Sequence, residues 1–563
     1  MSAAEVGVIR SLSGANTITG QISLQAASEM QADAGSLTFD TSAISAFIGA
    51  YNLTLDANSG DITVADPIAT STGTLTKSGA GTLTLQAANT YTGNTMVSAG
   101  VVAISSGGAL GESGGTRGKT TVADNATLSL SGDVTVAEPI EITGDGVTVS
   151  SAEVGAIRST SGTSTISGAV TLLTAASEVQ VDSGSSLTLS GGVTGTNIAL
   201  TVDSPGTSSI AAITTGTGSV TKLGGGTLTL SGANTYSGDT TISEGTLTVS
   251  GSGALGAGSP NDYSGAITNN SAFVYASSAS QTLRGVISGT GTLTKNASSS
   301  SQLTLWGANT YSGATTITSG IVALRDSTSL GTTAGTTTVA NDATLSMANN
   351  VTVAEAITIT GDGVTESSVE VGAIRSTSGT NTISGAVTLA SVSEVQIDSG
   401  SSLTLSGGVT GTNLALVVDS PGTSSIAAIT TGSGTLTKSG AGTLTLSGAN
   451  TFTGATTINA SGGTLSVTGT LGSGTYAGAI AIGASSTLSM ASNSNQTLQT
   501  GVISGSGALT KSGSGTLTLS ATNTYTGDTT ISAGVGVVGN ASALGNSSTG
   551  TTVASGATLQ VGA

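Results

Sequence analysis

Three short runs, Gly73-Thr74-Leu75-Thr76-Lys77, Gly81-Thr82-Leu83-Thr84-Leu85 and Asn89-Thr90-Tyr91-Thr92-Gly93, form one phrase that decides the fold of this 563-residue chain. The phrase is present in five near-copies, whose lysines are Lys77, Lys222, Lys295, Lys438 and Lys511. The position numbers of successive lysines differ by 145, 73, 143 and 73. Because self-similarity at fixed intervals is the signature of stacked repeats, the spacing predicts a solenoid.

A second marker sets the length of one coil. The run Glu153-Val154-Gly155-Ala156-Ile157-Arg158 has counterparts that begin at Glu5 and Glu370. Each of these glutamates has a second one after it at an offset of 24 or 25, and these are Glu29, Glu178 and Glu394. Since 73 and 145 are close to three and six times 24, we expect coils of about 24 residues stacked along one axis.

The same markers organise the whole chain. We interpret 1–563 as one continuous solenoid with three long internal units, 1–152, 153–369 and 370–563. The sequence has no charged and apolar leader of the signal-peptide type, and no run of 18 apolar residues that would cross a bilayer. We therefore interpret it as a fragment of a longer repeat array, without direct insertion into a membrane.

The composition indicates an all-β chain. It contains 85 Gly, 5 Pro, 2% aromatic and 7% charged residues. Runs such as Thr82-Leu83-Thr84-Leu85 and Thr246-Leu247-Thr248-Val249 alternate hydroxyl and apolar residues with period two. Leu and Val should therefore face the core, while Thr and Ser face the solvent.

The phrase resembles the passenger-associated transport repeat, also called the autotransporter-associated β-strand repeat. The closest copies are 73–95, 218–240, 434–456 and 507–529, and all five together cover roughly a quarter of the chain. The resemblance implies a right-handed parallel β-helix in the exported passenger of a bacterial cell-surface protein, often an adhesin.

The third copy departs from the others. It carries two extra residues between Lys295 and Leu303, and Trp306 takes the position that Ser231 and Ser447 hold in two sister copies.

Charge and cysteine content exclude some partners. The net charge is −18, the 12 basic residues are scattered, and there is no Cys. Nucleic acids and anionic membrane surfaces require clusters of Lys and Arg, so we expect neither as a partner. The lack of Cys is compatible with export into an oxidising compartment.

The sequence offers little for catalysis. Without His or Cys, the common nucleophile and base pairs and zinc sites are excluded, and no cluster of Asp, Glu and Arg is evident. We expect no enzyme activity, no catalytic residue and no cofactor. The lysines of the phrase are interpreted as solvated strand ends, Asn89 and its counterparts as turn residues in the left-handed conformation that Asn tolerates, and Tyr91 and its counterparts as rings with hydroxyl groups in water.

The doubled glutamates are the best candidates for a site. A coil of the expected length would place Glu153 beside Glu178 and Glu370 beside Glu394, and like charges at that distance repel. Arg158 and its counterparts are the simplest compensation. The alternative is bound Ca²⁺, which prefers clustered carboxylates, with Glu153, Glu178, Glu370 and Glu394 as ligands.

These observations favour a non-enzymatic structural segment of a secreted bacterial adhesin or extracellular fibre, acting as a rigid stalk or scaffold. One alternative is a subunit of a self-assembling filament or surface layer. A second is a passenger that binds or cleaves carbohydrate. We expect an extracellular, cell-surface location, with other surface or matrix components, or further copies of the chain, as partners.

Overall fold

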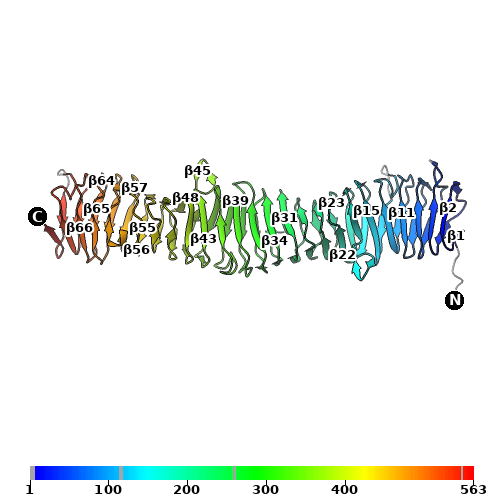
Figure 1. Ribbon diagram of the computed structural model, residues 1–563, viewed down its shortest axis with the longest axis horizontal. Coiled ribbons are helices and arrows are strands. Elements are labelled where there is room, and N and C mark those ends of the chain that lie inside the picture. The colour runs from blue at the N-terminus through cyan, green and yellow to red at the C-terminus, as the bar shows by residue number, and fades with distance from the viewer. Residues whose placement is uncertain are drawn as a thin grey trace. The chain divides into compact units, whose positions relative to one another are not determined.

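The computed structural model describes residues 7–42, 44–112, 118–256, 258, 261–546 and 550–562. In these ranges the regular structure is β-strand, apart from one 3₁₀ turn, η1 (Gly472–Gly474). Strands pair in parallel with strands about 22 residues further along and form a β-solenoid (Figure 1). The predicted fold class is therefore confirmed, and its right-handed winding stays a prediction.

The chain divides into two compact units, Met1–Gln281 and Thr282–Ala563, and each is described on its own. In unit 1, β10 (Leu75–Ser78) and β11 (Thr82–Leu85) occupy two faces of one coil. A third face follows at Asn89, whose side chain and neighbouring backbone bond to the coil before. Whether the units continue one another, and the division at 152 and 369, stay predictions.

The coil of about 22 residues is shorter than the 24 expected, because tight corners separate the strands. Some coils are longer. Leu128 pairs with Ile157, for example, because a hairpin is inserted between them. The offset of 24 or 25 between glutamates is not a coil length, because Ile157 pairs with Val179, 22 residues further along.

Successive phrases lie on different faces. In unit 1, Leu83 of the first phrase connects to Lys222 of the second by six steps of one coil each, so the second lysine continues the face of the first phrase's second strand. The strands of this ladder are β11, β13 (Gly100–Ile104), β15 (Ala126–Ser131), β20 (Ile157–Ser161), β22 (Val170–Val181), β25 (Leu200–Asp203) and β28 (Val220–Leu223).

Unit 2 repeats this arrangement. Six steps lead from Leu303 of the third phrase to Lys438 of the fourth. The strands are β38 (Gln302–Leu305), β39 (Thr315–Leu324), β41 (Ala343–Met347), β46 (Ile374–Ser376), β48 (Val387–Ile397), β51 (Leu416–Asp419) and β54 (Leu436–Ser439).

The shorter interval follows the same rule. Leu446 of the fourth phrase connects to Lys511 of the fifth by three steps. Here the strands are β55 (Thr443–Leu446), β58 (Thr464–Val467), β62 (Thr487–Met490) and β65 (Ala508–Lys511). Within each unit, an interval between phrases is therefore three or six coils plus one face, and the expected whole multiples of 24 are wrong there.

Alternation along the strands builds both the core and the surface. In β55, Leu444 and Leu446 are buried, while Thr443 and Thr445 are partly exposed. Outward hydroxyl residues stack from coil to coil on this face of unit 2. One column runs through Thr382, Thr404, Ser425, Thr445, Ser466, Ser489 and Thr510.

The lysines of the phrase are buried, which corrects the expectation of solvated strand ends. Lys77 and Lys438 are 0% exposed, and Lys511 is 3% exposed. Lys77 Nζ donates to the carbonyl oxygens of Ser78, Gly79 and Ala99 at 2.8, 2.7 and 3.0 Å. These three acceptors match the three N–H groups of an ammonium, so the lysine satisfies carbonyl groups at a corner and on the next coil.

The asparagines of the phrase fasten three coils together. Asn309 Oδ1 accepts from the N–H of Ile287 at 2.7 Å, and its Nδ2 donates to the Ser329 oxygen at 2.7 Å. None of the five has a positive φ, so the expectation of left-handed turn residues is wrong. Equivalent bonds are made by Asn89, Asn234, Asn450 and Asn523.

The tyrosine hydroxyls of the phrase are also buried, and not in water as expected. Tyr311 is 0% exposed, and its Oη lies 2.6 Å from Thr315 Oγ1. The fourth phrase has Phe452 in place of tyrosine, and there Thr456 bonds Tyr476 of the next coil at 2.9 Å. The threonine therefore keeps a hydroxyl partner even when its own phrase has none.

Candidate functional site

Two hairpins depart from the parallel stack and carry two of the four candidate glutamates, whereas Glu178 and Glu394 lie on β22 and β48. In unit 1, β18 (Thr148–Val149) pairs antiparallel with β19 (Ala152–Glu153). In unit 2, β44 (Thr365–Glu366) pairs in the same way with β45 (Val369–Glu370), and this hairpin projects from the side of the stack (Figure 1). All these strand residues are exposed.

Consecutive serines close each hairpin. Ser150 and Ser151 have φ of 50° and 69°, and Ser367 and Ser368 have φ of 49° and 67°. Positive φ at both central residues is the geometry of a type I′ turn, whose twist suits a two-residue hairpin. Glu153 and Glu370 are thus each the last strand residue of an exposed hairpin, and they lie outside the parallel ladders.

The glutamates are not paired in register as predicted. Ile157 pairs with Val179, so Glu178 lies beside Ala156, whose backbone N–H donates to the backbone carbonyl oxygen of Glu178 at 2.9 Å. Unit 2 has the same arrangement, since the backbone N–H of Ala373 donates to the backbone carbonyl oxygen of Glu394 at 2.9 Å. The coil, being shorter than expected, shifts each second glutamate by about three positions from the expected pairing.

The glutamates nevertheless lie close enough to repel. Burial, together with the neighbouring carboxylates Asp203, Asp145 and Glu153, raises the pKa of Glu178 to about 7. Burial, together with Asp419, Asp362 and Glu370, likewise raises the pKa of Glu394 to about 7. The repulsion is therefore relieved in part by protonation near neutral pH.

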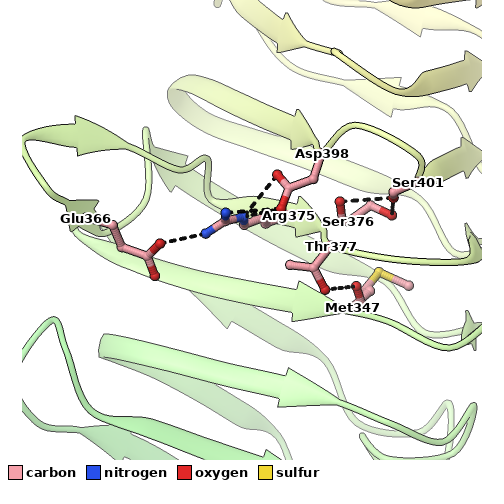
Figure 2. Close-up of polar contacts among 7 residues, drawn as sticks. All are labelled: Met347, Glu366, Arg375, Ser376, Thr377, Asp398 and Ser401. Atoms are coloured by element: carbon pink, nitrogen blue, oxygen red, sulfur yellow. Dashed lines mark hydrogen bonds and ion pairs between the residues drawn. The ribbon is translucent and has the colours of Figure 1, made fainter.

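The expectation that the arginines neutralise the doubled glutamates is wrong, because Arg158 and Arg375 form ion pairs with other carboxylates. Arg158 Nη2 lies 2.9 Å from Asp182 Oδ2, one coil further on. Arg375 lies between Glu366 of the hairpin at 2.8 Å and Asp398 of the next coil at 3.1 Å (Figure 2). Ser376 Oγ and Ser401 Oγ are hydrogen-bonded to each other at 2.6 Å, and this pair lies beside the ion pair (Figure 2).

The carboxylates do not gather as a metal centre would. Within the described ranges, no group of three or more Asp or Glu side chains has the arrangement of a metal site. Glu5 lies outside those ranges. Calcium binding at Glu153, Glu178, Glu370 and Glu394 stays a prediction to be tested.

Two buried glutamates were missed in the sequence. Glu138 and Glu355 are 8% and 4% exposed, and each accepts a hydrogen bond from a threonine hydroxyl, of Thr120 and of Thr337. Burial raises the pKa of Glu355 to about 7. The signal was present: in Val136-Ala137-Glu138, period two places the glutamate on the inward side with the valine.

One further finding concerns membranes. Across the described residues, no helix has the length and apolar character that crossing a bilayer would require.

Comparison with known proteins identifies the repeated phrase. The model of the passenger-associated-transport-repeat family matches five segments, 75–104, 220–249, 298–324, 436–467 and 509–535. No curated protein and no solved structure matched the chain. The repeats and the β-solenoid fit the passenger of an autotransporter, and that family implies a secreted, cell-surface protein.

Proposed function

We propose that this chain, which carries five passenger-associated transport repeats on a β-solenoid, is a non-enzymatic structural segment of a secreted bacterial adhesin or extracellular fibre. It acts as a stalk or scaffold that holds other parts of the assembly away from the cell. Its partners are other surface or matrix components.

The observation that carries the proposal is the way each phrase fastens its own coil to the two adjacent coils. Lys438 donates to carbonyl groups of its own corner and, at 2.8 Å, to Gly462 of the next coil. Asn450 bonds Ile429 of the coil before at 2.9 Å and Thr470 of the coil after at 3.0 Å. Stability in such a stack is approximately a sum of nearest-neighbour terms, which allows a spacer of variable length.

Changing the number of repeats tests the spacer role. Residues 439–511 extend from one phrase lysine to the next, so inserting three further copies adds about ten coils and about 48 Å at a strand spacing of about 4.8 Å. The chain would be displayed on cells with an epitope at its far end, and the height of the epitope above the membrane measured by atomic force microscopy. An unchanged height would contradict a spacer.

The non-enzymatic part has its own test. The purified chain is incubated with cell-wall, exopolysaccharide and peptide panels, and we expect no released product. Product release that a single Asp or Glu substitution abolishes would overturn the proposal. Sedimentation of the same sample distinguishes an isolated stalk from a self-assembling filament.

A further inference from the structure

Trp306 of the third phrase lies on the surface and not in the core. It is the only tryptophan of the chain and is 46% exposed. The guanidinium of Arg284 lies over its ring, 4.6 Å from the ring centroid. An arginine in this position is attracted to the indole face and restricts the rotation of the ring.

A second arginine lies on the other side of the tryptophan along the stack. The backbone N–H of Trp306 donates to the backbone carbonyl oxygen of Leu283 at 2.9 Å, and the backbone N–H of Arg325 donates to that of Leu305 at 3.1 Å. These bonds place Arg284, Trp306 and Arg325 at one corner of three consecutive coils. The three residues are called the Arg-Trp-Arg strip below, and they span about 10 Å at a strand spacing of about 4.8 Å.

The sister phrase shows that the strip departs from the repeat at three positions. The same corner of the fourth phrase has Ser447, flanked on adjacent coils by Ala427 and Thr468. These side chains are small and uncharged. A fold that is complete with Ala, Ser and Thr does not require Arg, Trp and Arg, so the strip is not explained by stability of the coil.

Within the described ranges, Arg325 lacks the carboxylate environment of Arg375. One N–H of the Arg325 guanidinium donates to the Leu324 oxygen at 3.0 Å, and burial lowers the pKa of this arginine. For Arg375, burial also acts to lower the pKa, but hydrogen bonds to Asp398 and Glu366 raise it overall. Asp326, next to Arg325, bonds Thr328 through its Oδ1 at 2.8 Å. An anionic ligand would supply Arg325 with the acceptor oxygens that Arg375 already has.

We propose that the Arg-Trp-Arg strip binds an anionic polysaccharide, with a sugar ring against Trp306 and a carboxylate or sulfate group at Arg325. The apolar face of a sugar ring packs on an exposed indole, and the planar fork of an arginine fits carboxylate and sulfate oxygens. Arg284 positions the indole. Because the chain has a net charge of −18, electrostatic repulsion acts against contact between the same polymer and acidic surfaces elsewhere on the chain. The inference goes beyond the proposed stalk function and does not depend on it.

The single tryptophan makes the test direct. The full chain is titrated with polygalacturonate, alginate, chondroitin sulfate and neutral dextran while the intrinsic tryptophan fluorescence is recorded. We expect a saturable change with at least one anionic polymer and none with dextran, weakened by salt because the contact is partly electrostatic. Binding elsewhere on the chain would leave the emission of Trp306 unchanged.

Four variants assign the contact, with affinity measured by biolayer interferometry. Trp306→Ser restores the sister residue and Arg325→Gln removes the guanidinium, and each should weaken binding about tenfold or more. Ser447→Ala is the matched control at the equivalent corner and should bind like the original chain. The triple variant Ala427→Arg, Ser447→Trp and Thr468→Arg should double the number of bound ligands. Circular dichroism checks that every variant is folded.

Several results would overturn the proposal. It is wrong if no anionic polysaccharide binds at low salt, if dextran binds equally well, or if Trp306→Ser leaves the affinity unchanged. Equal binding of poly-glutamate would also overturn it, because that result identifies an acidic protein segment as the partner.

Discussion

The fourth phrase and the second hairpin lie in the same unit, yet they use polar side chains in opposite ways. In the phrase, Lys438 and Asn450 are 0% exposed and bond to backbone groups of adjacent coils. In the hairpin, Glu366 and Glu370 are exposed. The comparison indicates that polar residues inside the coil hold the stack together, whereas those of the hairpin are additions that the stack does not need.

The largest effect should come from deleting part of the phrase. Removing residues 439–450 takes out about half a coil, so inward leucines of later coils would face the wrong side, and we expect loss of cooperative folding. Removing residues 439–511 should be tolerated, because it joins Lys438 to Ser512-Gly513, which matches the original Ser439-Gly440. Circular dichroism and thermal melting compare the two deletions.

A hairpin deletion is the matched control for that result. The N–H of Val371 donates to the Val364 oxygen at 3.1 Å, so residues 365–370 can be replaced by two glycines that close the same turn. We expect this variant to fold and melt close to the original chain. If it unfolds while the 439–450 deletion folds, the contrast between phrase and hairpin is wrong.

Removing one buried side chain should have a smaller effect. Lys438→Met keeps much of the apolar stem but leaves three buried or partly buried carbonyl oxygens without their donor, and we expect a loss of about 2–4 kcal/mol in the free energy of unfolding. Lys119→Met is the control, because the Lys119 side chain is 47% exposed and its ion pair with Glu141 is on the surface. Urea denaturation of both variants measures the difference, and equal losses would contradict the role assigned to Lys438.

Glu394, which lies on β48, should affect stability through pH. The pKa of Glu394 is about 7 in the folded chain against an ordinary value of 4.5, so protonated Glu394 favours the fold. Its contribution is fully present below about pH 4.5 and is lost as the pH rises through 7. Glu394→Gln imitates the protonated acid, so the variant should gain stability above pH 7 and change little at pH 4. Melting temperatures between pH 4 and 9 measure both.

The same variant tests calcium. We expect neither Ca²⁺ nor a chelator to change the melting temperature of the original chain, because the carboxylates do not gather as a metal centre in the described ranges. A rise with Ca²⁺ that Glu394→Gln removes would establish the metal site instead.

The smallest effect should come from the ion pair of the second hairpin. Glu366 binds Arg375, while the first hairpin has Val149 at the corresponding position and forms the same turn without that pair. We therefore expect Glu366→Val to change the free energy of unfolding by less than about 1 kcal/mol, since exposed ion pairs contribute little. A loss above about 2 kcal/mol by urea denaturation exceeds what an exposed pair contributes and would show that the hairpin is part of the stack.

The sequence predicted the β-solenoid because strand alternation and repeat spacing are properties of the chain itself. It failed on the lysines because composition suggests solvent for any Lys, although period two in Leu75-Thr76-Lys77 places the lysine inward with the leucine. It failed on the glutamate pairing because the coil length was taken from repeat intervals. Such an interval is the sum of whole coils and one additional face, and the sequence alone does not divide it into these parts. The strand register made that separation, for example from Leu446 to Lys511.

The advance by one face gives unit 2 no preferred side. Its three phrases start on three different faces, so whatever chemistry a duplicated phrase carries is presented at every azimuth about the axis. A neighbour approaching from any direction meets an equivalent surface. Trp306 occurs in one phrase alone and therefore marks one side of the stack. A single substitution thus distinguishes one side from the others, which the repeats by themselves do not.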